Sequence, residues 1–220
     1  MPGMYLGCSI AVNGVCLTVT AFDETKNTFE FNFTLETARL TNLPDLKKGS
    51  LCNLERSMKM GDGRNSGHFV QGHVDDTGTV ISRQQEGAMV VFKISLAGKV
   101  DSEGIPLMRY VVSKGYVAVD GTSLTICLVD AKEEWFTLMM VPHTLERVVT
   151  GRKQVGDIVN VEVDVMGKYV QRSVGSLGGG THRISVMENR VTFAERVAGV
   201  ALLVAVGGAL FSFITRGPRT

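Results

Sequence analysis

The sequence predicts an all-β protein built from two tandem copies of one small barrel, followed by a C-terminal helix. Three observations support this prediction: an internal repeat, apolar alternation at the period of β-strands, and turn dipeptides between the apolar runs. The chain has 220 residues, enough for two small domains. Short strands at regular spacing favour a closed barrel, because closure removes exposed strand edges.

The internal repeat is the strongest of these observations. The stretches 9–19 (SIAVNGVCLTV) and 116–126 (YVAVDGTSLTI) read alike. One constant offset then keeps the two copies in register for about fifty residues without a gap. The matched pairs include Phe29 with Phe136, Thr37 with Thr144, and Glu55 with Glu162. Chance similarity does not keep register across several strands, so we interpret the chain as a duplicated domain.

Each copy reads as β structure. Residues 29–33 (FEFNF) and 159–165 (VNVEVDV) alternate between apolar and polar side chains, which is the period of a strand with one buried face. Short helical turns are expected after Thr37 and Thr144, where a Thr-x-x-x-Leu or similar run follows a strand. The remaining residues of each copy are expected to be strands and turns.

Two turn dipeptides occupy equivalent places in the copies. Asn13-Gly14 and Asp120-Gly121 each lie between apolar runs. A tight hairpin requires positive φ at both central residues, which Asn, Asp and Gly adopt most readily. We therefore predict a hairpin at each dipeptide.

The two copies differ in what precedes them. A long lead precedes the second copy, with GHFVQGHV at 67–74 and a strand-like run at 89–94, whereas few residues precede Gly7. By symmetry the first copy lacks its first two strands, about thirty to forty residues. We therefore expect a truncated first barrel, in a chain that is either a fragment or the product of a mis-started gene model. The expected parts are a first barrel at 1–67, a second barrel at 68–174, a glycine-rich linker at 175–183 and a C-terminal helix at 184–220.

Composition and charge argue against several classes of function. A net charge of +1 gives no electrostatic case for nucleic acid. The four cysteines are scattered without a CxxC pair, which favours reduced thiols in an intracellular compartment over disulfides or a zinc site. His68 and His73 lie five residues apart, so on a straight strand they point to opposite faces. We expect no metal site, and of the two histidines we expect His68 to be structural.

Four motifs carry a resemblance to a known family. They are NGVCLT at 13–18, DGTSLT at 120–125, GHFVQGHVD at 67–75 and PHTLE at 142–146. Together they resemble the lumazine-binding repeats of riboflavin synthase, over roughly Gly7 to Val174. The sequence departs from that family in three places: the opening Met-Phe-Thr-Gly segment is absent, Ser66 stands where a second glycine is usual, and Gln71 replaces a usual small residue.

The resemblance implies a fold, an assembly and a reaction. The fold is two tandem six-stranded Greek-key barrels, and the assembly is a homotrimer that uses neither a metal nor an organic cofactor. The reaction converts two molecules of 6,7-dimethyl-8-ribityllumazine into riboflavin and 5-amino-6-(D-ribitylamino)uracil. The active site lies where the first barrel of one chain meets the second barrel of its neighbour. Holding two flat molecules face to face is the largest task, because orientation contributes several powers of ten in rate.

The resemblance also assigns site residues, position by position. The first pocket comprises Cys16, Leu17 and Thr18 together with Asn32, Phe33, Thr34, Leu35, Glu36 and Thr37. The second pocket comprises Gly72, His73, Val74, Lys114, Ser123, Leu124, Thr125, Met139, Met140, Val141, Pro142, His143 and Thr144.

Five residues are the candidates for catalysis: Ser9, Cys16, His73, Asp120 and Ser123. Ser9 and Cys16 resemble the polar pair that activates a nucleophile or water at the acceptor. His73 and Asp120 are the candidates for proton movement near the donor, and a histidine suits that work because its pKa lies near neutrality. Ser123 takes the place of Cys16 in the second copy, which argues for a polar role shared by both pockets.

Each candidate also has a plain structural interpretation. Asp120 is the first residue of a predicted hairpin turn, and Cys16 can be a small buried hydrophobe. Thr37 and Thr144 can cap the turns that follow them. Lys114 can be an ordinary solvated lysine.

The residues after Val174 do not belong to the repeat. Residues 184–194 have the spacing of an amphipathic helix, and 197–214 carry no charge between Arg196 and Arg216. Such a run is at the lower limit for crossing a bilayer. Our hypothesis is a carboxy-terminal membrane anchor, with a buried helix of the trimer or a mis-predicted coding end as the rivals.

The function that we predict is the reaction of this family, in the cytoplasm or a plastid. The alternative is a non-catalytic lumazine- or flavin-binding protein, because optical antenna proteins share these repeats. A third interpretation is a membrane-tethered scaffold without activity. The joint presence of the five catalytic candidates favours the enzyme, since a binding protein has no use for groups that move protons.

Overall fold

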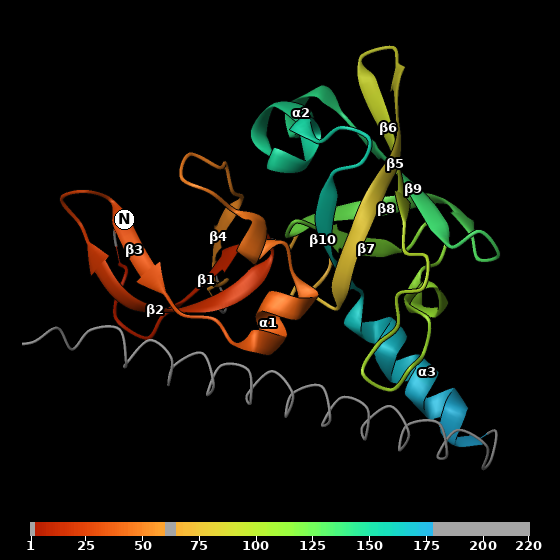
Figure 1. Cartoon of the computed structure of the whole chain (residues 1–220). Coiled ribbons are helices and arrows are strands. Elements are labelled where there is room, and N and C mark those ends of the chain that lie inside the picture. Colours follow the sequence, from red (N-terminus) through yellow and green to blue (C-terminus); the bar gives the residue numbers. More distant parts are fainter. Residues whose placement is uncertain (1–2, 60–64, 178–220) are drawn as a thin grey trace, which may run out of the picture. The chain divides into compact units, whose positions relative to one another are not determined.

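The computed structural model describes residues 3–59 and 65–177, which belong to one compact unit. Both copies of the repeat form β structure within it, as Figure 1 shows. The first copy forms a four-stranded sheet, and the second forms a closed barrel of six strands. The prediction of an all-β protein with a six-stranded second barrel is therefore confirmed.

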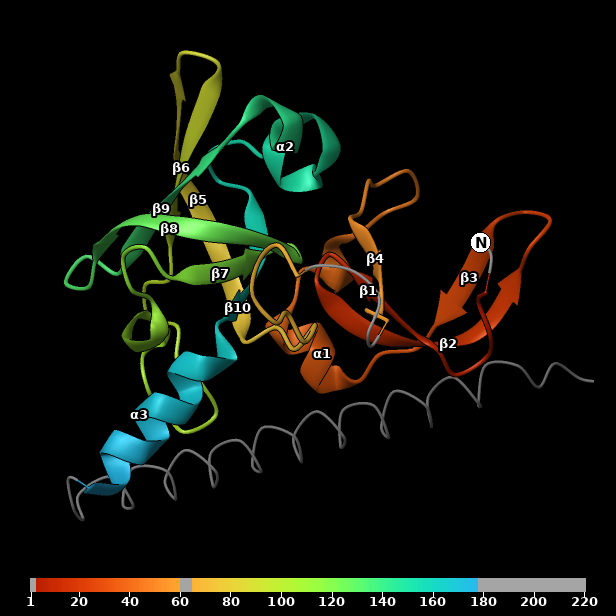
Figure 2. The same ribbon diagram turned by 180° about the vertical axis from the view of Figure 1, so that it is seen from behind.

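The sheet of the first copy has the strand order β3-β2-β1-β4. Its elements are β1 (Ser9–Val12), β2 (Val15–Asp23), β3 (Thr28–Phe31), α1 (Leu35–Leu40), the short 3₁₀ helix η1 (Leu43–Asp45) and β4 (Leu54–Arg56). The predicted strand at 29–33 ends at Phe31, and α1 follows it (Figure 2). Among the described residues, this sheet has no counterpart of the β5–β6 hairpin that opens the second copy.

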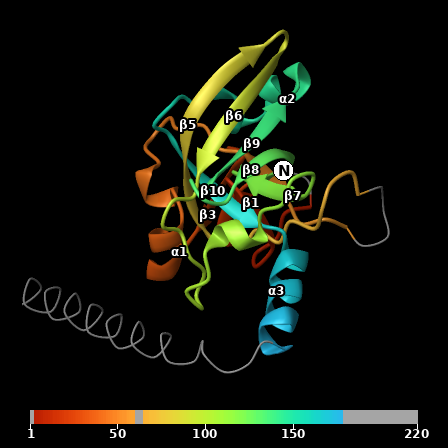
Figure 3. The same ribbon diagram turned by 90° about the vertical axis from the view of Figure 1, so that its right-hand side faces the viewer.

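The barrel of the second copy closes in the order β10-β5-β6-β9-β8-β7. Its strands are β5 (Asp76–Glu86), β6 (Met89–Ser95), β7 (Tyr116–Val119), β8 (Thr122–Asp130), β9 (Trp135–Met140) and β10 (Ile158–Val163). The helical segments are η2 (Leu107–Tyr110), α2 (Pro142–Arg147), η3 (Val149–Arg152) and α3 (Val165–Leu177). Figure 3 shows the long β5–β6 hairpin from the side.

Strand alternation fills the barrel with one large core. Phe92, Ile94, Phe136 and Leu138 are fully buried within a single cluster of apolar side chains. The first copy buries less, in two small clusters, one around Val12, Val15, Leu17 and Leu43 and the other around Met4, Ile10 and Val19. Because stability rises with the apolar area buried, the barrel is the more strongly stabilised half.

The two predicted hairpins touch at the junction of the copies. Asn13 and Asp120 have φ angles of 46°, and Gly14 and Gly121 follow them with φ of 78° and 80°. A Cβ on Gly121 would lie 2.8 Å from the Cα of Gly14, so the backbones are in direct contact. The hairpin predictions are confirmed, and both turns form part of the contact between the copies.

Two asparagines, one from each copy, donate a hydrogen bond to the hairpin turn of the other copy. The Nδ2 of Asn53 donates to the backbone oxygen of Asp120 over 2.8 Å, and the Nδ2 of Asn160 donates to the backbone oxygen of Asn13 over the same distance. Asn53 and Asn160 are equivalent positions of the repeat. The hydrogen bonds therefore follow an approximate two-fold relation between the copies.

The helix α3 differs from the expectation for the end of the second barrel. It begins at Val165 and continues to Leu177, through the boundary at 174 and into the predicted glycine-rich linker. Its first turns are held by tertiary contacts, since Lys168 Nζ lies 2.6 Å from Asp75 Oδ1 and Gly167 lies against Tyr110. Glycine composition alone does not reveal such contacts.

The remaining tail predictions, the rest of the linker and the helix at 184–220, lie outside the described residues. The hypothetical anchor at 197–214 lies there too. Within the described part of the chain, no helix is both long enough and apolar enough to cross a membrane.

Candidate functional site

The first predicted pocket lies on the outer face of the β1–β2 pair. Ser9 pairs directly with Thr18, and Ala11 pairs with Cys16, so these four side chains share one face. Cys16 and Thr18 are exposed, whereas Leu17 between them is buried in the core. The structure therefore brings Ser9, Cys16 and Thr18 together, and Cys16 is not the buried hydrophobe of the alternative interpretation.

The second predicted pocket lies on the outer face of β8 and β9, and β8 is the equivalent of β2 in the first copy. Thr125 and Met139 are exposed and Ser123 is half-buried, all on alternate positions of their strands. Leu124 and Met140 point into the barrel core. Like Leu17, these two apolar residues can present only backbone groups to a ligand on the outer face.

Short helical turns flank both faces, beginning earlier than predicted. The helix α1 starts at Leu35, and its N-cap is Thr34, whose Oγ1 accepts from Thr37 N over 3.2 Å. The helix α2 starts at Pro142, with Val141 at the N-cap position. The alternative in which Thr37 and Thr144 cap the turns is therefore wrong, because both lie inside the first turn of a helix.

The other predicted binding residues lie at the edges of these faces. Asn32, Phe33 and Glu36 are exposed around the start of α1, and His143 is exposed on α2. Lys114 is also exposed and has a φ of 65°, with its backbone N–H donating to Ile126 O over 2.9 Å.

One segment, Gly67–Asp75, contacts both faces, and we call it the crossing segment. The backbone N–H of Cys16 donates to Gly72 O over 2.8 Å, and Val74 packs on the apolar cluster of the first copy. The prediction that placed Gly72, His73 and Val74 in the second pocket needs correction, because Gly72 and Val74 lie against the first copy. The prediction assigned these residues to the second copy because they directly precede β5 in the sequence. In the structure, the chain still lies against the first copy at this point.

His68, which lies five residues before His73 in the crossing segment, contacts the second face. His68 Nδ1 lies 2.7 Å from Ser123 Oγ, and its ring stacks on Tyr116 with 5.2 Å between the centroids. Burial lowers the pKa of His68, and the carboxylate of Asp164 partly opposes this. His73 is exposed by comparison. His68 therefore combines a structural stacking role with a hydrogen bond to a candidate catalytic hydroxyl.

Asp120 lies in the junction between the copies. Its Oδ1 accepts from the backbone N–H of Asn160 over 2.8 Å and from Asn42 Nδ2 over 3.3 Å, and its Oδ2 accepts from Thr150 Oγ1 over 3.3 Å. The side chain is fully buried, and burial raises the pKa of Asp120 to about 6. These contacts favour the hairpin-turn interpretation of Asp120 over the catalytic one.

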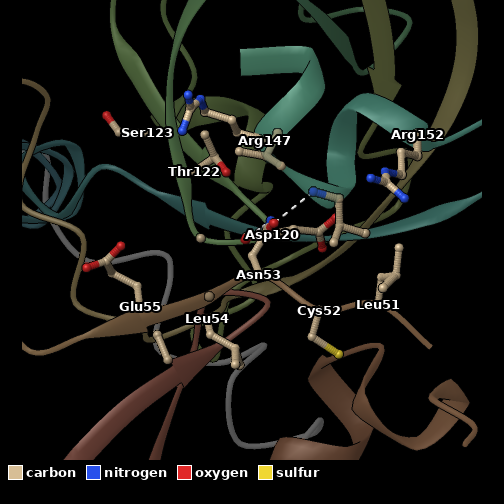
Figure 4. A pocket seen from close by; sticks show the side chains of 15 residues that line it. Leu51, Cys52, Asn53, Leu54, Glu55, Asp120, Thr122, Ser123, Arg147 and Arg152 are labelled. Carbon is tan, nitrogen blue, oxygen red and sulfur yellow. Dashed lines mark hydrogen bonds between the residues drawn. The ribbon is translucent and has the colours of Figure 1, made fainter. Parts of the chain in front are cut away.

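A cleft of 540 Å³ opens beside Asp120, between the two copies (Figure 4). Glu55 and Leu54 line it from the first copy, and Thr122, Ser123 and Arg147 line it from the second. Of the predicted binding residues it reaches only Ser123. The cleft borders both outer faces, because Ala11 of the first face and Ser123 of the second face line it.

Sequence reasoning missed two residues beside the second face. Tyr116 supplies the ring on which His68 stacks, and Asp164 is the carboxylate that acts on His68. Tyr116 is the first residue of the repeated stretch 116–126, and its equivalent in the first copy is Ser9. Because the two residues differ, the repeat did not indicate that an aromatic ring lies beside the second face. No cluster of metal-ligating side chains occurs within the part of the chain that the structure describes.

Comparison with known proteins assigns the chain to one family. The family model described as "Lumazine binding domain" matches residues 3–57 and 71–164, one match on each copy. The riboflavin synthase of Meyerozyma guilliermondii is 44% identical over 174 residues, covering 79% of this chain and 70% of the relative. The riboflavin synthase of Bacillus subtilis is 43% identical over 172 residues, covering 78% of this chain and 74% of the relative.

Solved structures give the same fold. LumP complexed with 6,7-dimethyl-8-(1'-D-ribityl) lumazine superposes with a TM-score of 0.61 at 19% identity, over 73% of this chain and 79% of that chain. LumP complexed with flavin mononucleotide superposes with a TM-score of 0.58 at 20% identity, with nearly the same coverage. At this identity the likeness concerns the fold alone.

Proposed function

This chain belongs to the lumazine-binding domain family that includes the riboflavin synthases, and we propose that it is itself a riboflavin synthase. The proposed reaction is the dismutation of two molecules of 6,7-dimethyl-8-ribityllumazine to riboflavin and 5-amino-6-(D-ribitylamino)uracil. One observation carries the proposal most directly: the duplicated repeat presents Cys16 and Ser123 at equivalent places on two outer faces.

Each face offers the groups that a flat, polar bicyclic ligand needs. Hydroxyl and backbone groups suit the pyrimidine edge and the ribityl chain, and exposed apolar side chains suit the ring. On the second face these are Ser123 and Thr125 beside Met139. On the first face they are Thr18 and Cys16, with the crossing segment close by.

The chemistry needs a proton to leave the C7 methyl group of the donor, and the resulting carbanion then attacks the acceptor. We assign Ser9 and Cys16 to activation at the acceptor, because they share the exposed face of β1 and β2. We assign proton movement to His73, which is exposed and follows directly on Gly72. Asp120 is assigned to the scaffold, because protein groups occupy both of its carboxylate oxygens.

We further propose a homotrimer in an intracellular compartment. The two outer faces belong to different copies of the repeat, and two lumazines must meet face to face for the transfer. A neighbouring chain brings a first face against a second face without rearranging either copy. The expected site is therefore shared between two chains.

A second candidate function is binding of a lumazine or flavin without turnover. The superposition on LumP supports this alternative, since that protein was crystallised with such ligands. Cys16 distinguishes the two functions, because a binding protein has no need of a free, exposed thiol beside Ser9.

The decisive experiment is to incubate the purified chain with 6,7-dimethyl-8-ribityllumazine and to follow riboflavin absorbance. The enzyme yields riboflavin, and we expect Cys16→Ser to lower kcat about tenfold or more, as expected for loss of a group that acts in the transition state. Tight binding with no riboflavin would support the binding protein instead. The variant Cys127→Ser, at a half-buried thiol, serves as the control, with kcat unchanged.

A further inference from the structure

One buried carboxylate of the second copy bonds to the middle of the crossing segment, directly before Gly72. We propose that Glu162 is a positioning residue, which holds Gln71–His73 in place so that Gly72 meets Cys16 and His73 faces the first pocket. This inference rests on the proposed function and adds a residue to its machinery. Glu162 lies on β10, far from Cys16 in the sequence, and was not among the predicted site residues.

The side chain of Glu162 is bonded to the backbone of the crossing segment. The N–H of Gln71 donates to Glu162 Oε1 over 2.7 Å, and the residue is only 2% exposed. Burial raises the pKa of Glu162, while the backbone N–H groups of Gln71, His73 and Gly72 lower it. The bond from Gln71 to this buried carboxylate fixes the backbone of the crossing segment directly before Gly72, because a hydrogen bond to a charged acceptor is strong and directional.

The turn that Glu162 holds is in tight contact with the first copy. Gly72 has a φ of 79°, and a Cβ there would lie 2.7 Å from the Cβ of Cys16 and 2.9 Å from its nitrogen. Together with the hydrogen bond from Cys16 N, this leaves the turn little room to shift. If the bond from Gln71 to Glu162 is lost, we therefore expect Gly72 to move and to change its contact with Cys16.

The end of the crossing segment has its own anchor. Asp75 accepts from the backbone N–H of Val163 over 2.9 Å and from Lys168 Nζ over 2.6 Å. These bonds fix the chain where it enters β5, three residues beyond Gly72. Removal of Glu162 should therefore release the turn and leave the barrel closed.

The repeat supplies a matched control at Glu55. It occupies the position equivalent to Glu162, and each pairs with an alanine on the neighbouring strand, Ala11 for Glu55 and Ala118 for Glu162. Glu55 is exposed and lines the cleft, whereas Glu162 is buried under the crossing segment. The same substitution at both positions thus separates the positioning role from the general effect of losing a strand glutamate.

The experiment compares Glu162→Leu, Glu162→Gln and Glu55→Leu with the wild type. We expect Glu162→Leu to lower kcat about tenfold or more with KM for the lumazine within about threefold, because misplacing a catalytic group slows the chemical step. Glu162→Gln keeps an acceptor oxygen for the N–H of Gln71 and should keep kcat within about threefold of wild type. Glu55→Leu should lower kcat by less than Glu162→Leu does, because the N–H of Gln71 is bonded to Glu162.

A second readout does not depend on turnover: the rate at which iodoacetamide alkylates Cys16, read by peptide mass spectrometry with Cys127 as the internal reference. We expect Cys16 to be alkylated faster in Glu162→Leu than in Glu55→Leu, and at the wild-type rate in Glu162→Gln. If the wild type makes no riboflavin, the proposed function fails and the alkylation rates still test the positioning of Gly72.

The inference is overturned if Glu162→Leu matches Glu55→Leu in both kcat and the alkylation rate of Cys16. It is also overturned if Glu162→Gln loses as much kcat as Glu162→Leu, since then the charge and not the acceptor matters. Thermal unfolding verifies that each variant is folded. Should Glu162→Leu not fold, Glu162→Asp takes its place, because its shorter side chain draws the acceptor away from Gln71 N, and its failure to lower kcat would contradict the inference.

Discussion

Asp120 and Asn13 occupy the same place in the two copies with different side chains. Both residues have a φ of 46°, and both accept a backbone hydrogen bond from an asparagine of their own copy, Asn160 and Asn53. An amide therefore suits this position as well as a carboxylate does. The carboxylate of Asp120 carries an extra penalty, because burial disfavours its charged form.

This penalty predicts a pH-dependent stability. The pKa of Asp120 is raised from 3.8 to about 6 in the folded protein. Its contribution to the free energy of unfolding is therefore fully present below pH 3.8 and is lost as the pH rises through about 6. Relative to Asp120→Asn, we expect the wild type to lose about 2 kcal/mol of stability between pH 4 and pH 7. Urea denaturation of both proteins at the two pH values measures the difference.

The same variant separates the two interpretations of Asp120. A scaffold residue predicts that Asp120→Asn keeps kcat within about tenfold, whereas loss of a general acid or base lowers the rate by about a hundredfold or more. A stability difference that stays constant between pH 4 and pH 7 would contradict the raised pKa.

Single residues were predictable from the sequence where the repeat fixes them. The offset identified Cys16 and Ser123 as equivalent, and the structure places both on outer faces. It could not show that Gly72 lies against Cys16 or that His68 lies against Ser123, because these contacts join segments more than fifty residues apart in the chain. Tertiary contacts of this kind leave no periodic signal in the sequence.

At the scale of elements, the two hairpins form the central contact between the copies. They were predictable because Asn-Gly and Asp-Gly between apolar runs specify a tight turn. Their mutual contact was not predictable, since it depends on how the copies pack. Gly14 and Gly121 therefore serve two requirements, positive φ and close backbone approach.

These two requirements can be separated by alanine substitution. Gly121→Ala would place a Cβ 2.8 Å from Gly14, whereas Gly104, with a similar φ of 77°, has nothing within 4 Å of an added Cβ. We expect Gly104→Ala to cost about 1–2 kcal/mol from the left-handed backbone alone. Gly121→Ala should cost at least about 2 kcal/mol more, since backbone must also move. Equal losses in urea denaturation would argue against the contact between the hairpins.

Helical elements were harder to place than strands. The turns predicted after Thr37 and Thr144 exist, yet they start at Leu35 and Pro142. The helix α3 was not predicted, because Gly167 and Gly175 within it disfavour a helix. Contacts with Asp75 and Tyr110 stabilise it in the structure. Short helices that depend on tertiary contacts have weak local signals.

At the scale of the molecule, duplication produces two related faces that are not identical. The second copy closes into a six-stranded barrel, while the first forms a four-stranded sheet. The crossing segment covers Glu162 in one copy and leaves Glu55 exposed in the other. The repeat predicted the relation between the halves, but it did not show that the crossing segment covers only one of the two equivalent glutamates.

The central claim is that each copy of the repeat carries a ligand face, and a binding titration tests it most directly. We would titrate the chain with riboflavin, the proposed product, and follow flavin fluorescence to obtain the number of ligands bound per chain. The account predicts two, one of which is weakened by Ser123→Ala while the other is unchanged. A single bound riboflavin whose affinity does not respond to Ser123→Ala would contradict it.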